Sequence, residues 1–392
     1  MWVSHLYSLN QITDRYGNIS LYLICTSIII LILLTIRKKE QSEAFQKLNK
    51  NDFFLPSTLK NLKGCAVIFL IIGHLSLKCI EGKFLLENAG FWAVTIFLFS
   101  SGVTLSNKYL IKSIKKKFWI KRIKRIFVPL WITLVIFYML DYLLLGKTYS
   151  KIKILSSFCG IIIPPLPNSP LWFISYILFW YLIVYIAICL ETTLPMRILF
   201  TFIASYIVMI LINIFDLKDY LGSWIQYTTV YPAAVFIGVN YRKISFLIRK
   251  FIRISFSTFL LFAFVFLIAY KFYDSFTLKD YFEFTPITVI VIKTFRPLFL
   301  MCFLTMFAFL IEQIKYESKF LEALGEYSYE LYLLHFPFLV SYDFLLFRKP
   351  LLLFFYLYLF CLFCLSYLLN YSSCFLTKII FRCPERPINS AA

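Results

Sequence analysis

The chain has 392 residues, of which 61% are hydrophobic and only 15% are charged. An average soluble protein is about half apolar and about a quarter charged, so a water-soluble fold of this length cannot bury the apolar excess. The apolar residues come in long runs, and about 18 consecutive apolar residues are enough to cross the hydrocarbon core of a bilayer as a helix. The composition therefore excludes a soluble protein and predicts an all-α, polytopic integral membrane bundle.

Eleven apolar spans are expected along the chain. We place them at 20–36, 62–79, 89–106, 126–145, 171–190, 198–214, 224–240, 254–270, 297–311, 324–346 and 350–370. The first span is followed by basic residues instead of being preceded by them, so we expect an anchor and not a cleaved signal peptide. This predicts an N-terminal anchor and linker at 1–58, a ten-helix membrane domain at 59–371 and a short tail at 372–392.

The net charge is +20, from 40 lysines and arginines against 20 acidic residues. In a soluble chain this excess would indicate nucleic acid, but in a membrane protein basic residues gather in the cytoplasmic loops. About two thirds of the 40 basic residues fall in loops that are cytoplasmic if the N-terminus lies outside. The charge therefore predicts an N-out, C-in topology and requires no nucleic-acid partner.

Ionisable residues inside a span are costly and are functional candidates. Lys63 and His74 lie on the second span and, at 100° per residue, share one helix face about 16 Å apart along the axis. Lys63 then marks the cytoplasmic end, where it can hold an anion, and His74 lies deeper, where a neutral imidazole can act as a base. A lysine reaching toward the interface and a histidine bonded to a neighbouring helix are equally consistent with the spacing.

His335 stands on the tenth span, and Ser328 lies two helical turns before it on the same face. Pro337 removes a backbone donor and frees the carbonyl of Leu333 as an acceptor. Glu330 is a second intramembrane charge and lies off that face. Such a cluster can orient a substrate or the first histidine, although a helix-packing network explains the same pattern.

A basic segment runs from Lys108 to Arg125. Within it Arg122 and Arg125 are three residues apart, so on a helix they share a face and can grip phosphates bidentately. Anchoring on an anionic leaflet would need only their charge. The segment therefore predicts either a phosphate site or a membrane-surface contact.

Three further features have structural interpretations. Ser101 and Gly102 end the third span with small residues, which allow close helix packing. Trp172 opens the fifth span as an interfacial anchor. Most of the ten cysteines fall inside spans, where free cysteine behaves as a small apolar residue, so no metal site is expected.

These motifs, in this order, resemble membrane acyltransferase family 3, whose multi-span members modify bacterial surface polysaccharides. The resemblance covers about 59–371 and rests on five motifs: Lys63 with His74, Phe97 to Gly102, Arg122 and Arg125 before Pro129, Leu171-Trp172-Phe173, and Leu324-Gly325 with Ser328-Tyr329, Tyr332-Leu333 and His335. Lys63 stands where the family usually has arginine, so the planar fork is lost there. The span at 20–36 is additional to the family's usual ten.

The resemblance implies an O-acyltransferase, most simply an O-acetyltransferase, in the inner or plasma membrane of a bacterium. It would move an acyl group from cytosolic acyl-CoA, a substrate and not a permanently bound cofactor, to a hydroxyl of a free or lipid-linked saccharide. Two other classes remain open: a transporter or flippase for lipid-linked saccharides with the histidines as a proton relay, and a polysaccharide polymerase.

Each candidate residue then has an expected role. We expect His74 and His335 in catalysis, with His74 as the base for the acceptor hydroxyl, and we expect Lys63, Arg122 and Arg125 at the CoA phosphates. The residues expected to be structural or orienting are Ser101, Gly102, Trp172, Ser328, Glu330 and Tyr332.

Overall fold

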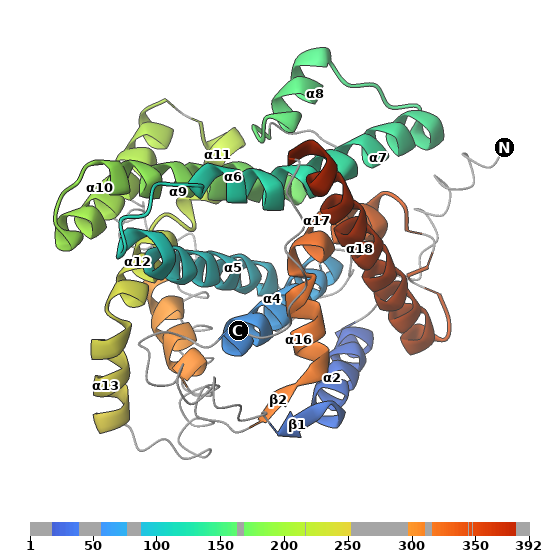
Figure 1. The fold of residues 1–392 in the computed structure, drawn as a ribbon. Coiled ribbons are helices and arrows are strands. Elements are labelled where there is room, and N and C mark those ends of the chain that lie inside the picture. The colour runs from blue at the N-terminus through green and yellow to red at the C-terminus, as the bar shows by residue number, and fades with distance from the viewer. Residues whose placement is uncertain are drawn as a thin grey trace, which may run out of the picture.

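The computed structural model describes residues 18–38, 56–76, 88–162, 168–215, 217–251, 297–309, 316–343, 345–346 and 348–381. The regular elements of this part of the chain are helices, apart from one short pair of strands (Figure 1). Six of its helical segments are long and apolar enough to cross a membrane. They are α4 (Pro56–Ser76), α5 (Ala89–Leu105) continued by η1 (Ser106–Leu110), α6 (Phe118–Arg122) continued through η2 (Ile123–Phe127) into α7 (Val128–Leu145), α9 (Trp172–Cys189), α10 (Leu194–Ile214) and α18 (Leu351–Phe381).

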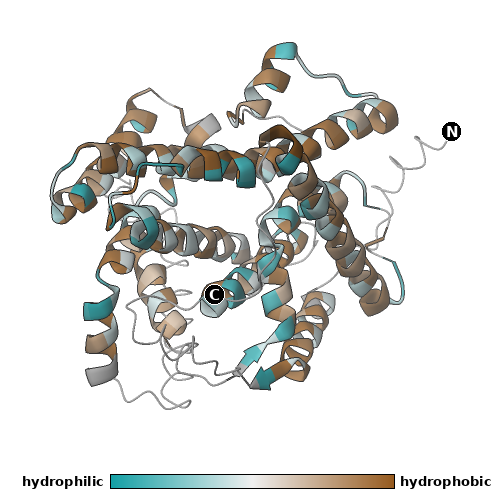
Figure 2. Cartoon of the chain, in the orientation of Figure 1, coloured by the Kyte–Doolittle hydropathy of each residue, from teal (hydrophilic) through white to brown (hydrophobic). Residues whose placement is uncertain are grey.

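Most predicted spans coincide with helices of the structure. Besides these six, the predicted spans at 20–36 and 297–311 coincide with the shorter apolar helices α2 (Asn18–Leu34) and Pro297–Phe309. Hydrophobic residues dominate α7, α10 and α18 (Figure 2), and many large apolar side chains on these helices are exposed. The helical membrane class is thus supported, whereas the number of eleven spans and the N-out, C-in orientation remain predictions. The span at 254–270 lies outside the described residues.

Two predicted spans are interrupted. In place of 224–240 and 324–346 the chain forms α11 (Lys218–Ile225) with α12 (Val230–Val239), and α16 (Lys319–Glu326) with α17 (Ser328–Val340). Thr228 lies in the first break, and its hydroxyl donates to the carbonyl of Ile225 at 3.0 Å. Irregular backbone at membrane depth is tolerated where protein buries it, and Thr228 is buried. The remaining short helices are α8 (Lys151–Phe158), η3 (Ser169–Leu171) and α13 (Tyr241–Phe251).

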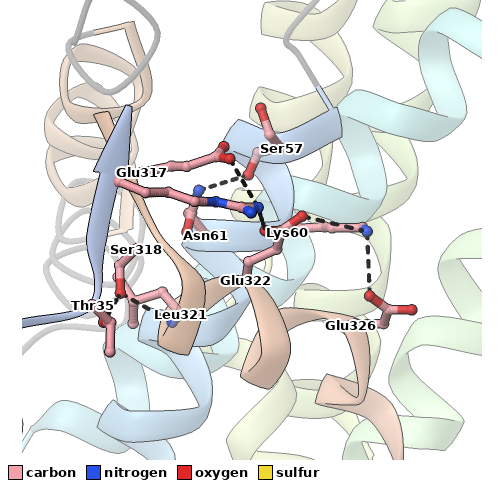
Figure 3. Close-up of polar contacts among 10 residues, drawn as sticks. Thr35, Ser57, Lys60, Asn61, Glu317, Ser318, Leu321, Glu322 and Glu326 are labelled. Carbon is pink, nitrogen blue, oxygen red and sulfur yellow. Dashed lines mark hydrogen bonds and ion pairs between the residues drawn. The ribbon is translucent and has the colours of Figure 1, made fainter. Parts of the chain in front are cut away.

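A small antiparallel ribbon, absent from the all-α prediction, joins the N-terminal part to the second half of the chain. Strand β1 (Ile36–Lys38) pairs with β2 (Tyr316–Ser318), so that Arg37 stands opposite Glu317. The Nη2 atom of Arg37 lies 3.2 Å from Glu317 Oε1 and 2.7 Å from Glu322 Oε2 on α16 (the region shown in Figure 3). The ribbon therefore ties α2 to the start of α16.

Helix α4 lies at the centre of the bundle beside α5 (Figure 1) and meets its neighbours at small residues. A Cβ atom added to Gly73 of α4 would lie 2.5 Å from the backbone nitrogen of Gly90 on α5. A Cβ atom added to Gly325 of α16 would collide with the backbone of Lys60 on α4. Both crossings require glycine because the backbones touch. The helix that carries Lys63 and His74 is thereby held between α5 and α16.

Candidate functional site

The two histidines expected inside spans lie side by side. The rings of His74 on α4 and His335 on α17 have centroids 5.2 Å apart and are tilted by 38°. The ring of Phe336 lies 5.0 Å from that of His74. His335 is fully buried and His74 is half-buried. Two helices distant in sequence therefore form one histidine pair.

The proton on His335 is located by its hydrogen bond. Its Nδ1 atom lies 2.7 Å from the carbonyl oxygen of Tyr332. A carbonyl oxygen only accepts, so Nδ1 donates, and in the neutral ring the lone pair is on Nε2. Nε2 of His335 and Nδ1 of His74 are both buried without a hydrogen-bond partner among the described residues. The pair therefore presents a buried basic nitrogen, whereas the described residues contain no group of three or more metal-ligating side chains.

The carbonyl predicted to be free beside Pro337 does act as an acceptor. Asn168, which directly precedes η3, donates from Nδ2 to the carbonyl of Leu333 at 2.7 Å. Tyr358 on α18 donates to the carbonyl of His335 at 3.1 Å. The gap that proline leaves in α17 is thus filled by a side chain from another segment, and no motif had singled out Asn168.

A large cavity of about 1080 Å³ opens beside α4. Its lining includes two acidic residues, both of which have partners. Oε2 of Glu326 lies 3.4 Å from Nζ of Lys60, and Oε1 of Glu330 accepts a hydrogen bond from Nδ2 of Asn370 at 2.8 Å. The basic residues of the lining are Lys60, Lys63, Lys108, Lys112, Lys124, Arg125 and Lys378. The cavity is therefore cationic and favours an anionic ligand.

A second, smaller cavity of about 280 Å³, called the narrow cavity below, adjoins the first. The residues common to both linings are Lys63, Thr104, Lys108 and Arg125. Lys121 and Arg122 also line the narrow cavity, and the rest of its walls are largely apolar and aromatic, among them Phe97, Ile126, Phe173, Ile174 and Ile177. Ser328 and Tyr332 of α17 line it as well. A charged chamber joined to a smaller, partly apolar branch suits a ligand with an anionic head and an uncharged arm.

Tyr332 lies between the narrow cavity and the histidine pair. It is 4% exposed, and its ring centroid is 5.6 Å from that of Phe173 and 6.0 Å from that of His335. Its hydroxyl donates to the carbonyl of Pro170 at 2.5 Å. Neither His335 nor His74 is among the described residues that line the two cavities. In this conformation the Tyr332 ring therefore separates the cationic cavities from the histidines.

The two arginines expected at a phosphate occupy different surroundings. Arg125 is exposed and lines both cavities. The guanidinium carbon of Arg122 lies 4.0 Å from the ring centroid of Phe118 and 4.2 Å from that of Tyr109, and Nη1 donates to Phe118 O at 3.1 Å. The expectation of a shared face assumed α-helical geometry, but residues 123–127 form a π-helix, which turns less per residue. Both arginines nevertheless line the narrow cavity.

The remaining candidates of the first half pack around these cavities. Ser101 lines the narrow cavity, and its Oγ atom is 3.1 Å from the hydroxyl of Tyr181. Gly102 packs closely on α12, so the close approach expected there is present. Trp172, expected at the membrane interface, stacks its ring on the buried Tyr227 with centroids 5.7 Å apart. Trp172 therefore makes a contact inside the bundle as it opens α9.

No sequence motif singles out Arg197 at the start of α10. It is 8% exposed, and Nη1 donates to the carbonyl of Leu110 at 3.0 Å and to Ser113 Oγ at 2.5 Å. Nearby, Lys115 Nζ lies 2.7 Å from Glu191 Oε1, and this hydrogen bond raises the pKa of Lys115 and lowers the pKa of Glu191. The turn between α9 and α10 thus holds the basic segment in place, a contact that no local sequence pattern signals.

Apolar helices around a cationic cavity, with buried imidazoles beside it, define a multi-pass membrane protein in which this cavity lies close to buried basic nitrogens. A family model described as an acyltransferase domain matches residues 57–371, which include both histidines. The chain therefore belongs to membrane acyltransferase family 3. No curated protein and no solved structure matches the chain significantly.

Proposed function

We propose that the protein is an integral-membrane O-acyltransferase that moves an acetyl group from cytosolic acetyl-CoA to a sugar hydroxyl of a surface polysaccharide. Family membership supports acyl transfer as the reaction class. The observation that carries the choice of donor is the cationic cavity of about 1080 Å³ with its narrow branch, which ends at Tyr332 beside the histidine pair.

Acyl-CoA matches the two cavities in charge and shape. Its phosphorylated nucleotide is anionic, and the larger cavity is at the upper end of the size usual for small-molecule sites. Lys63 and Arg125 stand where the cavities join, and no acidic residue in the described part of the chain pairs with either. They therefore remain available to the phosphates, while the thin, uncharged pantetheine arm occupies the branch lined by Phe97 and Phe173.

The histidine pair supplies the base. Nε2 of His335 carries the lone pair, because Nδ1 is committed to the carbonyl of Tyr332. We therefore give His335 the role of base that we expected of His74 from the sequence: it takes the proton of the sugar hydroxyl as that oxygen attacks the thioester carbonyl, and CoA leaves as the thiolate. A route through an acyl-histidine needs the same lone pair. The ring of Tyr332 has to move for the thioester to reach the pair, so its displacement admits the donor.

The topology and location belong to the same proposal. An N-out, C-in orientation in a bacterial inner or plasma membrane opens the cationic cavity to the cytosol, where acyl-CoA is made. The connection that carries Asn168 then lies on the outer side, toward a free or lipid-linked saccharide. Arg125 and Lys63 at the cytosolic mouth agree with the positive-inside rule.

The test is transfer by purified protein. Proteoliposomes receive radiolabelled acetyl-CoA and the surface polysaccharide purified from a gene-deletion strain, and we expect label in the polysaccharide. Mass spectrometry of glycan from wild-type and deletion strains should show acetyl groups only in the wild type. Movement of saccharide across the bilayer without acetyl-CoA would instead identify a flippase, and altered glycan chain length in the deletion strain a polymerase.

A further inference from the structure

Asn168 and the two histidines each carry a buried polar atom without a hydrogen-bond partner among the described residues. These atoms are Oδ1 of Asn168, Nδ1 of His74 and Nε2 of His335. Asn168 is only 1% exposed. Buried polar atoms in folded proteins are nearly always satisfied by protein, water or ligand. The unsatisfied Oδ1 of Asn168, whose amide is bonded to the helix that carries His335, therefore points to a ligand.

The orientation of the Asn168 amide follows from its hydrogen bond. The carbonyl of Leu333, 2.7 Å away, accepts only, so the amide must present its NH₂ group there. The amide oxygen consequently points elsewhere and is left as an acceptor. A ligand that meets it must offer a donor, such as a hydroxyl group.

The position of the amide follows from α17. His335 Nδ1 donates to the carbonyl of Tyr332, and Asn168 donates to the carbonyl of the next residue, Leu333. Successive carbonyls of a helix point toward its C-terminal end and are about 100° apart around the axis. The imidazole and the amide are therefore bonded to successive carbonyls of the same turn of α17, about 100° apart around its axis.

The acceptor needs its own access to this turn. Tyr332, hydrogen-bonded to the carbonyl of Pro170, separates the histidines from the cavities assigned to acyl-CoA. Asn168 is not among the described residues that line those cavities, and it belongs to the connection between α8 and α9. That connection is the one the N-out topology places on the outer side. In the proposed topology Asn168 therefore lies on the side from which the saccharide arrives.

We propose that Oδ1 of Asn168 accepts a hydrogen bond from a hydroxyl of the saccharide, adjacent to the hydroxyl that the histidine pair deprotonates. Sugars carry such neighbouring hydroxyls, so one group is held while the other reacts. The bond to Leu333 holds the amide in the required orientation, which makes Asn168 a binding residue for the acceptor. This inference rests on the proposed acyl transfer to a sugar.

The test compares the two substrates in the Asn168→Ala protein. The probe is the surface polysaccharide purified from the gene-deletion strain, titrated in the proteoliposome assay. The apparent KM for this polysaccharide should rise about tenfold, as expected for one lost hydrogen bond, while the KM for acetyl-CoA stays within about twofold. Asn213→Ala is the matched control, because the exposed Asn213 on α10 also donates to a backbone carbonyl, that of Met209, at 2.7 Å. It should change neither KM.

A second variant separates acceptor binding from helix support. Asn168→Asp keeps an oxygen at Oδ1 but replaces the NH₂ donor to Leu333. If Asn168 only supports α17, this variant should lower the unfolding temperature and impair both substrates as much as Asn168→Ala does. Acceptor binding predicts a polysaccharide KM between those of the wild type and Asn168→Ala, because the acceptor oxygen is kept while the bond that orients it is lost. Should Asn168→Ala fail to fold, Asn168→Ser, whose hydroxyl is too short to replace the amide oxygen, takes its place.

Two outcomes would overturn the inference. One is an unchanged polysaccharide KM in Asn168→Ala, and the other is an equal rise in both KM values. A wild-type protein that transfers no acetyl group to the polysaccharide would refute the proposed function itself. A wild-type protein that does transfer, together with an unaffected Asn168→Ala variant, would refute only the role of Asn168.

Discussion

The cationic cavities and the histidine pair meet at Tyr332, and they are built on opposite principles. The larger cavity carries several basic side chains, among them Lys108 and Arg125, which are exposed and similar in charge. The pair consists of His74 and His335, whose unpartnered nitrogens are buried. Several basic side chains of the cavity can replace one another in attracting an anion, whereas no neighbouring group in the described part of the chain can replace either imidazole nitrogen. Substitutions in the cavity should therefore weaken binding by degrees, and substitutions in the pair should abolish the chemistry.

The largest effect is expected from His335→Asn. The asparagine NH₂ group can still donate to the carbonyl of Tyr332, but the variant lacks the nitrogen that holds the lone pair. Removing a general base costs about 10²–10⁴-fold in rate, so kcat should fall within that range. The Kd for acetyl-CoA, measured by calorimetry, should stay unchanged because Tyr332 lies between the two regions. Loss of acetyl-CoA binding would show that they are not separate.

Gly325→Ala tests the wall of the large cavity. The added methyl group would collide with the backbone of Lys60 and force α16 away from α4. Overpacking of this kind costs about 1–3 kcal/mol, which should appear as a lower unfolding temperature in a thermal-shift assay. Gly90→Ala is the control, since nothing lies within 4 Å of its added Cβ atom. Equal stability of the two variants would contradict the close crossing of α16 and α4.

Arg125→Ala and Lys63→Ala should each raise the KM for acetyl-CoA about tenfold, because each removes a charged donor from the junction of the cavities. The kcat value should change much less. Higher salt should reduce the difference in KM between the alanine variants and the wild type. The Lys63→Arg variant keeps the positive charge, so its KM should stay close to that of the wild type. Lys147→Ala, on the exposed connection after α7, provides a basic residue outside both cavities as control. A fall in kcat with an unchanged KM would show that these residues act in the chemical step and not in acetyl-CoA binding.

The smallest effect is expected from Glu191→Gln. The ion pair with Lys115 is fully exposed, and such pairs contribute little. The KM for acetyl-CoA should stay within about twofold of the wild type, measured in the same titration. Arg197, which is buried against Leu110 and Ser113, should hold the basic segment without it. A larger effect would mean that the exposed pair shapes the cavity mouth.

Local patterns predicted where several of the candidate residues lie. Lys63 and His74 lie on one helix, α4, as their spacing predicted, and the carbonyl beside Pro337 accepts a hydrogen bond from outside its helix. The backbone departs from a regular helix at two places that these patterns did not mark. The predicted span at 224–240 is interrupted between α11 and α12, and residues 123–127 form a π-helix. Composition is the same for a continuous and an interrupted helix, so it registers neither feature.

Within the printed sequence, the runs of apolar residues determined that the chain forms membrane helices, and the fixed 100° step of a helix determined which residues of one helix share a face. Only the tertiary structure decided that His74 meets His335, that Tyr332 closes the narrow cavity, and that Asn168 reaches α17. These contacts depend on how helices cross, which is set by glycine contacts such as Gly73 against Gly90. Helical periodicity is local and visible in the sequence, whereas the register between helices is a property of the packed bundle.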